Sequence, residues 1–245
     1  MRKRLDLCVM EKRGFSRTYA REVIEAGLVL VNGSAATRPG SLAFTDDIEV
    51  LAADMPYVSR GGYKLAGALE TFGINVNGLV CLDVGASTGG FTDCMLKAGA
   101  RMVYAVDAGR GQMADALLDD PRVVRFEGVD VRGLALPAPV DFVSCDVSFI
   151  SACKVIPSIN LLLKPGGGFV CLIKPQFETE GRYLNKKGIV KNKSARESAV
   201  NTVHEALRGS GFFIKNTMES PVTGGDGNIE YLTYSIKVDD RYDAK

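Results

Sequence analysis

Between residues 80 and 237 the chain alternates short apolar runs with segments of helical periodicity, and this alternation constrains its fold more than any other feature. It is typical of an α/β domain with a Rossmann-like, doubly wound sheet covered by helices on both faces. The expected strands are Val80–Val84, Met102–Asp107, Val123–Phe126, Phe142–Cys145 and Phe169–Ile173. The expected helices are Gly90–Ala98, Met113–Leu118, Cys153–Leu163 and Ser194–Arg208. Two final strands without a helix between them, which predicts an antiparallel pair at the sheet edge, are Phe212–Met218 and Tyr231–Lys237.

A smaller α/β domain is predicted in residues 1–55, ahead of a main domain in residues 56–245. Ser16 is suited to cap a helix that ends at Gly27, because glycine readily adopts the left-handed conformation that follows a helix. The small domain is completed by a strand, a hairpin turn and another strand, at Leu28–Val31, Asn32-Gly33 and Ile48–Leu51. Residues 52–56 are the expected linker, at which motion between the domains is a hypothesis from composition.

Several classes of function are excluded by what the chain lacks. Its six cysteines form no CxxC pair, so reduced, structural thiols are expected. The single histidine, His204, excludes multi-histidine metal sites, and no metal is expected. No apolar run approaches the roughly 18 residues that span a bilayer. No apolar segment follows the basic start Met1–Lys3, so we expect a cytoplasmic protein.

The formal net charge of +1 conceals an uneven distribution of charge. Among the first 21 residues, seven lysines and arginines oppose only Asp6 and Glu11. A second basic cluster consists of Lys186, Lys187, Lys191, Lys193 and Arg196. A single charge run is usually a solvated face, but two clusters that flank a candidate active site favour binding to a polyanion.

A glycine-rich loop after the first strand of the main domain predicts a cofactor site. It has the spacing GxxxGG, and the acidic Asp83 just ahead of it disfavours a phosphate and favours a cation such as the sulfonium of S-adenosylmethionine. Asp107 ends the second strand, where a carboxylate can bind ribose hydroxyls, and Asp130 follows the third, within expected reach of an adenine amino group. The predicted cofactor residues are Asp83, Gly85, Ala86, Ser87, Gly89, Gly90, Phe91, Thr92, Asp107, Asp130 and Asp146.

The N-terminal segment resembles the S-four-type RNA-binding module, which is named after a small-subunit ribosomal protein. The resemblance rests on Arg4-Leu5-Asp6, on Ser16-Arg17 with Ala20 and Ile24, and on the run from Gly27 to Gly33. It implies that basic residues of the first helix and the following loop contact RNA phosphates. The predicted RNA-binding residues are Arg4, Arg17, Arg21, Arg60, Lys186 and Lys187. The alternative is that the module only packs against the main domain.

Four further motifs resemble the TlyA family, whose catalytic domain is similar to the FtsJ-like ribose methyltransferases. They are Ser59-Arg60-Gly61-Gly62-Tyr63-Lys64-Leu65, Asp146-Val147-Ser148-Phe149, Lys174-Pro175-Gln176-Phe177-Glu178 and Gly227-Asn228-Ile229-Glu230-Tyr231-Leu232. The resemblance covers essentially the whole chain. It implies a catalytic tetrad of Lys64, Asp146, Lys174 and Glu230, and it implies ribosomal RNA as the substrate, with a cytidine ribose of the small subunit, the large subunit or both as the acceptor.

The chemistry of ribose methylation agrees with this tetrad. A 2′-hydroxyl is a poor nucleophile and must lose its proton as the methyl group arrives, which a neutral lysine could accept. Lys174 is the candidate base, because burial and the like charge of Lys64 would lower its pKa. Asp146 is expected to orient this base and help place the sulfonium, and Glu230 to position Lys64 or the ribose. Taken alone, each of these residues could instead belong to an ordinary ion pair.

Other methylation targets fit the sequence less well. Methyltransferases that act on amino groups usually have a Pro-Pro-aromatic loop at the position where this chain has Val147-Ser148-Phe149, and no Pro-Cys dipeptide indicates attack on a pyrimidine carbon. Expected partners are ribosomal RNA or ribosomal subunits, and neither DNA nor a membrane. Two rival functions stay open: a non-catalytic RNA-binding ribosome-assembly factor, and the membrane-active hemolysin suggested by the family's older name. The modified nucleotide and the oligomeric state are not predicted.

Overall fold

The computed structural model describes residues 1–13, 15, 17–51, 56–179, 181–224 and 227–239. Its N-terminal module contains the helices α1 (Leu5–Arg13) and α2 (Arg17–Glu25) and a short 3-10 turn, Thr45–Asp47. Five short strands form two antiparallel sheets, with β1 (Lys3–Arg4) beside β4 (Leu42–Ala43) and the order β3 (Ser34–Ala35), β2 (Val29–Val31), β5 (Ile48–Val50) in the other. Apolar side chains such as Leu5, Val9, Val23 and Ile24 form a core that belongs to this module alone.

The turn signals of the module are confirmed. Gly27 has φ 74° and donates its N–H to the carbonyl of Ile24 at 2.9 Å, as a helix-ending glycine does. Asn32 (φ 50°) and Gly33 (φ 76°) are both left-handed and link β2 to β3, as a type I′ hairpin requires. Ser16 lies outside the described residues, as does most of the expected linker.

The main domain is built on a seven-stranded sheet with the order β11-β12-β10-β9-β6-β7-β8. Its strands are β6 (Val80–Val84), β7 (Met102–Asp107), β8 (Val123–Glu127), β9 (Val140–Cys145), β10 (Leu163–Ile173), β11 (Phe212–Glu219) and β12 (Tyr231–Lys237). The first five pair in parallel, whereas β12 runs antiparallel to both β10 and β11. The predicted α/β class and the predicted antiparallel edge pair are therefore confirmed.

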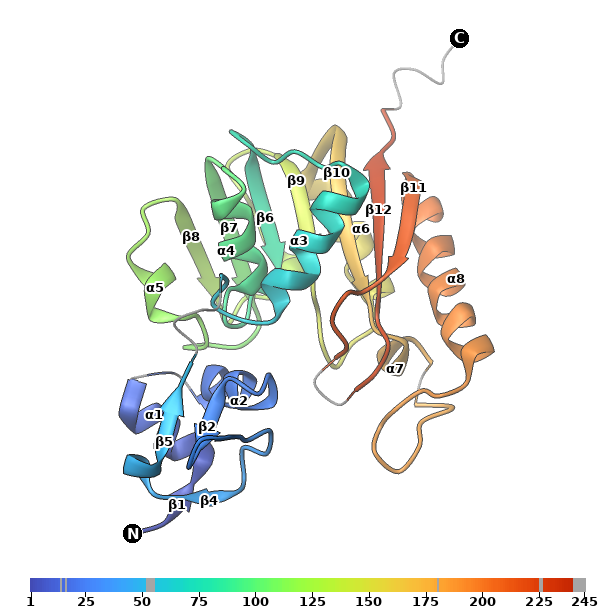
Figure 1. Ribbon diagram of the computed structural model, residues 1–245. Coiled ribbons are helices and arrows are strands. Elements are labelled where there is room, and N and C mark those ends of the chain that lie inside the picture. Colours follow the sequence, from blue (N-terminus) through green and yellow to red (C-terminus); the bar gives the residue numbers. More distant parts are fainter. Residues whose placement is uncertain (14, 16, 52–55, 180, 225–226, 240–245) are drawn as a thin grey trace.

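Helices cover both faces of this sheet (Figure 1). One apolar cluster contains Leu65, Leu69 and Met95 and lies beneath α3 (Gly61–Phe72) and α4 (Gly90–Lys97). The other contains residues such as Ile156 and Leu207 and lies beneath α6 (Ile156–Leu162) and α8 (Lys193–Gly209). The short helix α5 (Asp115–Leu118) lies between β7 and β8 in the chain, and the short helix α7 (Pro175–Glu178) lies between β10 and α8.

Two expected helices are shorter than predicted. The helix expected at Met113–Leu118 begins only at Asp115, and Met113 packs as a buried side chain ahead of it. The helix expected at Cys153–Leu163 divides into a 3-10 turn, Ala152–Lys154, and α6. Pro157 explains the division, because it has no N–H to donate to the carbonyl of Cys153, as a continuous helix would require.

The arrangement of the two parts positions the functional site. The carboxyl ends of the parallel strands point toward the N-terminal module, which lies below them in Figure 1. In doubly wound sheets, ligands bind beyond the carboxyl ends of the strands. The loops that follow these strands therefore lie on the side of the sheet nearest the module.

Candidate active site

Two adjoining cavities lie at the carboxyl ends of β6, β7, β9 and β10. The smaller has a volume of about 300 Å³ and the larger a volume of about 530 Å³. Gly85, Ser87, Asp146 and Ser148 line both, so the two cavities share a wall. The smaller volume lies at the lower end of the range for small-molecule sites, and the larger volume lies within that range.

The glycine loop between β6 and α4 forms much of this wall. A Cβ atom on Gly85, which has φ 82°, would lie 2.5 Å from the carbonyl oxygen of Asp146, so only glycine permits this close approach. A Cβ atom on Gly90 would collide with Ser59 Oγ at the start of α3. The predicted cofactor residues of this loop that line a cavity are Gly85, Ala86, Ser87, Gly90 and Phe91. Gly89 lines neither cavity, and a Cβ atom there would collide with the side chain of Leu117.

Asp83 and Thr92 lie beneath the loop and not on a cavity wall. Both are buried; the Thr92 hydroxyl donates to Asp83 Oδ2 at 2.7 Å, and the Ser144 hydroxyl donates to Oδ1 at 3.2 Å. Burial raises the pKa of Asp83 to about 7, although these two hydrogen bonds oppose the shift. The expectation that Asp83 and Thr92 face the cofactor is therefore corrected: in this structure they tie β6 to α4 and β9.

The buried carboxyl of Asp83 should make stability depend on pH. In the unfolded chain it ionises near pH 4, but in the folded protein only near pH 7, so the free energy of unfolding falls as pH rises between these values. Asp83→Asn should flatten that fall and raise the free energy of unfolding at pH 8, on the order of a few kcal/mol. Urea unfolding at several pH values measures this. Exposed Asp119, changed to Asn, is the control, and parallel pH profiles for wild type and Asp83→Asn would contradict the expectation.

Three predicted carboxylates, Asp107, Asp130 and Asp146, line the larger cavity. The backbone N–H groups of Ser87 and Gly109 donate to the two oxygens of Asp107, at 2.8 and 2.6 Å. This fixes Asp107 at the cavity wall and ties it to the glycine loop. Asp130 instead caps a 3-10 turn and accepts from the Arg132 backbone and guanidinium, which lowers its pKa to about 2. Its carboxylate is therefore already engaged.

The four residues of the implied tetrad come together as two ion pairs. Lys64 Nζ donates to Glu230 Oε2 at 2.6 Å, and their side chains are 11% and 2% exposed. Lys174 Nζ lies 2.5 Å from Asp146 Oδ1 and donates to Ser148 Oγ at 2.7 Å. The two lysines and Asp146 line the smaller cavity.

Secondary structure explains how four distant positions converge. Lys64 lies near the start of α3, Asp146 directly follows β9, and Lys174 directly follows β10, which ends at Ile173. Glu230 directly precedes β12, the antiparallel neighbour of β10. Two residues before it, buried Asn228 accepts from the Val190 N–H at 3.0 Å and so anchors this loop.

The electrostatics of the pairs correct one expectation. Burial acts to lower the pKa of Lys174, but Asp146 and Glu230 outweigh it, so this pKa lies above its ordinary value. Burial acts to raise the pKa of Asp146, but Lys174 and Lys64 outweigh it, so this pKa lies below its ordinary value. The lowering expected from the charge of Lys64 is not found, because the carboxylates of Asp146 and Glu230 raise the pKa of Lys174. In this state Lys174 is an ammonium ion.

Ser148 and Phe149, which follow Asp146 closely in the chain, add features that were not predicted from residue types alone. Ser148 accepts a hydrogen bond from Lys174, as noted above. Phe149 lines the larger cavity, is 89% exposed and has φ 66°, a conformation that non-glycine residues rarely adopt. Its ring lies 5.5 Å from that of Phe177. Their position next to Asp146 in one motif was the available signal.

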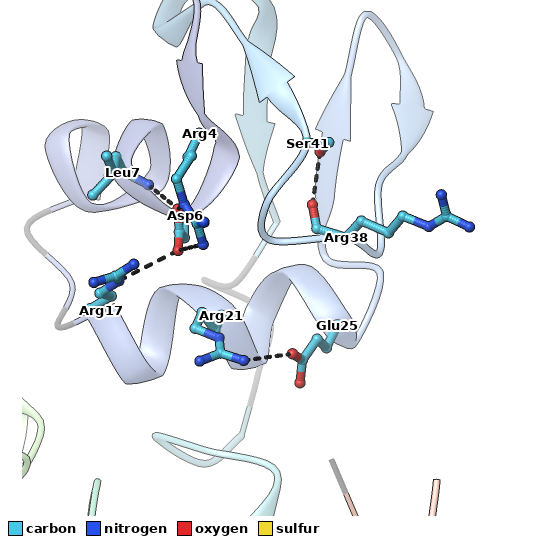
Figure 2. A network of polar contacts seen from close by, with 8 residues as sticks. All are labelled: Arg4, Asp6, Leu7, Arg17, Arg21, Glu25, Arg38 and Ser41. Carbon is cyan, nitrogen blue, oxygen red and sulfur yellow. Dashed lines mark hydrogen bonds and ion pairs between the residues drawn. The ribbon is translucent and has the colours of Figure 1, made fainter. Parts of the chain in front are cut away.

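The predicted RNA-binding residues fall into three places. Arg4 and Arg17 flank the buried carboxylate of Asp6, with a pair of hydrogen bonds at 2.8 and 3.0 Å from Arg4 and an ion pair at 3.5 Å from Arg17 (Figure 2). Arg21 on α2 and Arg60 at the start of α3 line the smaller cavity. The exposed Lys186 and Lys187 lie far along the chain, between α7 and α8. The structure therefore does not gather all six on one element.

Two family models match the chain. One is described as FtsJ-like methyltransferase and matches residues 57–237, and the other is described as S4 domain and matches residues 3–43. The chain belongs to the FtsJ-like methyltransferase family. The sequence predictions of this catalytic domain, of an S4-type module and of S-adenosylmethionine as the cofactor are thereby confirmed.

Relatives with names extend over most of the chain. It is 42% identical to "Hemolysin A" of Brachyspira hyodysenteriae, over 90% of this chain and 94% of that one. It is 39% identical to "16S/23S rRNA (cytidine-2'-O)-methyltransferase TlyA" of Mycobacterium tuberculosis, over 92% of this chain and 86% of that one. A solved structure from Streptococcus thermophilus that carries the name hemolysin is 38% identical, with a TM-score of 0.77, covering 97% of this chain and 89% of that one. Within the part of this FtsJ-like chain that the structure describes, no helix has the length and apolar character needed to cross a bilayer.

Proposed function

We propose that this protein transfers a methyl group from S-adenosylmethionine to a ribose 2′-hydroxyl of ribosomal RNA, with a cytidine as the acceptor nucleoside. The observation that carries the proposal is the pair of buried ion pairs, Lys64 with Glu230 and Lys174 with Asp146, beside the glycine loop of an FtsJ-like domain. Relatives from Mycobacterium tuberculosis and Campylobacter jejuni, named as rRNA cytidine-2'-O-methyltransferases, support the choice of substrate.

The larger cavity fits the cofactor. Gly85 leaves room that a Cβ atom would fill, and Asp107 is held at the wall by two backbone N–H groups. Val106, Val131 and Ile150 add apolar surface suited to an adenine ring. When bound, S-adenosylmethionine supplies an electrophilic methyl group on a positively charged sulfur. We infer that Gly85, Ser87, Asp107 and Asp146 bind it, with Asp130 at the margin.

The protein's own groups supply proton transfer and orientation. We infer that the ammonium group of Lys174 first releases one proton to solvent, and that the neutral amine then accepts the proton of the substrate hydroxyl at Nζ. Any weakening of its pairing with Asp146 lowers the pKa of Lys174, because burial then dominates. Lys64, held in place by its ion pair with Glu230, positions the acceptor ribose. Exposed Phe149 is suited to stack on a nucleobase at the cavity mouth.

Cofactor binding should depend more on Asp107 than on Asp130. Asp107→Ala is expected to weaken S-adenosylmethionine binding about 10- to 100-fold. The variant loses the charge-assisted hydrogen bonds of the Asp107 carboxylate and leaves the N–H groups of Ser87 and Gly109 unpaired at the cavity wall. Asp130→Ala should cost less than about 5-fold, since Arg132 already engages that carboxylate. Calorimetric titration measures both. Asp120→Ala removes a matching Asp-Arg pair with Arg122 away from the cavity and is the control. Equal losses at Asp107 and Asp130 would contradict the ranking.

We propose that residues 1–55 form an RNA-binding domain and residues 56–245 the methyltransferase domain. Separate apolar cores in the two parts support this division. RNA phosphates are the proposed partners of the basic residues Arg4, Arg17, Arg21, Arg60, Lys186 and Lys187. Because DNA lacks the 2′-hydroxyl, RNA is the proposed nucleic acid, and the proposed compartment is the cytoplasm, where ribosomes are assembled.

The proposed function is tested by transfer of labelled methyl groups. S-adenosylmethionine with a labelled methyl group is incubated with small subunits, large subunits and whole ribosomes that lack the modification. Incorporation into ribosomal RNA of at least one particle is the expected result. Binding to a particle without any transfer would contradict the proposal and would favour a non-catalytic ribosome-assembly factor.

A further inference from the structure

The smaller cavity is lined by both parts of the chain. Arg21 and Glu25 reach it from α2 of the N-terminal module, and Arg60, Lys64 and Lys174 reach it from the main domain. Arg21 and Glu25 lie one turn apart on the same face of α2. Figure 2 shows these two side chains pointing away from the rest of the module. The mouth of the catalytic site is thus completed by the module.

One carboxylate bridges two arginines at this mouth. Glu25 Oε1 lies 3.9 Å from Arg21 Nη2, and Glu25 Oε2 lies 3.6 Å from Arg60 Nη2. Both distances exceed the length of a hydrogen bond, so Glu25 balances the charge of the guanidinium groups without satisfying their donors. Glu25 and Arg60 are only 26% and 22% exposed in their side chains.

The guanidinium group of Arg60 has a hydrogen-bond donor that no described residue accepts from. A guanidinium group carries five N–H donors in a planar fork. Its Nε atom is buried and donates no hydrogen bond to any of the described residues. An unpaired buried donor costs free energy, and a ligand with several acceptor oxygens would remove that cost.

We propose that Arg21 and Arg60 form a binding site for one backbone phosphodiester of the RNA, and that Glu25 takes the place of this phosphate in the free protein. A phosphate, like a carboxylate, accepts two parallel hydrogen bonds from a guanidinium group, and the second guanidinium can share it. The site rests on the proposed function, because its ligand is the RNA substrate. It adds Glu25 as a group that competes with that substrate.

The position of the site connects binding to catalysis. Arg60 precedes α3, and Lys64 lies four residues further along the same helix. Lys64 and Lys174 line the same cavity as Arg21 and Arg60. A phosphate seated here therefore lies beside the reacting groups and fixes the register of the neighbouring ribose, whereas contacts at Arg4 and Arg17 lie outside the cavity.

The test is Glu25→Gln, which keeps the shape of the side chain and removes its charge. Its affinity for ribosomal subunits that lack the modification is measured at about 0.1 M and about 0.3 M salt. Loss of a like charge at about 4 Å from the phosphate predicts about five-fold tighter binding, with a smaller gain at the higher salt. Glu49→Gln, an exposed residue of the same module, is the matched control and should leave the affinity within about 1.5-fold.

A double-mutant cycle distinguishes this site from general electrostatics. Arg60→Gln should weaken binding about five- to ten-fold. Adding Glu25→Gln to Arg60→Gln, or to the double variant Arg60→Gln with Arg21→Gln, should then give no gain in affinity. If Glu25 instead served to hold the N-terminal module against the main domain, Glu25→Gln would weaken binding. Unchanged or weaker binding, or an equal gain in Glu49→Gln, overturns the proposal. Methyl transfer by the wild type is measured in parallel, so its absence would refute the proposed function, whereas transfer without the Glu25 effect would refute the phosphate site alone.

Discussion

Replacing Lys174 with alanine is expected to slow methyl transfer about 10²- to 10⁴-fold, because proton transfer by a positioned base contributes about this much. Lys174 lines the smaller cavity, and its Nζ atom contacts both Asp146 and Ser148 of the wall that the two cavities share. Single-turnover transfer to ribosomal subunits measures the effect. Lys164→Ala is the control, since Lys164 is an exposed lysine at the other end of β10 and should change the rate less than about two-fold.

Lys174→Arg separates a base from a mere positive charge. Arginine could keep the ion pair with Asp146 but cannot become neutral near physiological pH. We therefore expect Lys174→Arg to be as slow as Lys174→Ala. Since the pKa of Lys174 lies above its ordinary value, the wild-type rate should rise with pH over the neutral and alkaline range as the ammonium loses its proton. Activity retained in Lys174→Arg would contradict the role of a base.

Removing Glu230 is expected to destabilise the protein as well as inactivate it. Glu230→Ala removes the ion-pair partner of the buried Lys64, and loss of one partner of a buried pair typically costs about 3–5 kcal/mol. Denaturant unfolding measures this change. Glu197→Ala removes one partner of the exposed pair with Lys193 and should change the free energy of unfolding by less than about 0.5 kcal/mol.

A double variant separates stability from catalysis at this pair. Lys64→Met with Glu230→Leu removes both charges, and apolar replacement of a buried pair is often neutral or stabilising. We expect this variant to recover most of the lost stability and to remain inactive. An active double variant would show that the pair serves the fold alone, and a Glu230→Ala variant as stable as Glu197→Ala would contradict the burial argument.

The sheet could be predicted from the sequence because its central strands, such as β6 and β9, are short apolar runs buried on both faces. Helix α3 was not predicted, because its first residues, Gly61 and Gly62, favour a loop. The structure shows why glycine is needed: a Cβ atom on Gly62 would collide with the ring of Tyr57. Tertiary packing therefore decides this helix, against its local propensity.

The candidate site was only partly predictable. The tetrad follows from motifs, but its protonation depends on which charges meet in space. The sequence did not reveal how closely Asp146 and Glu230 approach Lys174, and together these carboxylates hold the pKa of Lys174 above its ordinary value. Nor did it reveal that Asp83 lies beneath the loop or that Glu25 reaches Arg60, because both depend on how separate elements pack.

The claim that the acceptor is a ribose 2′-hydroxyl is tested most directly by mapping the product. Ribosomal RNA methylated by the protein is digested to nucleosides and analysed by mass spectrometry, and the labelled position is located by its resistance to alkaline cleavage. The expected result is a 2′-O-methylated nucleoside, with no label when a 2′-deoxynucleotide replaces the mapped residue. A label on the base, or methylation that persists in the deoxy substrate, would contradict the proposed reaction.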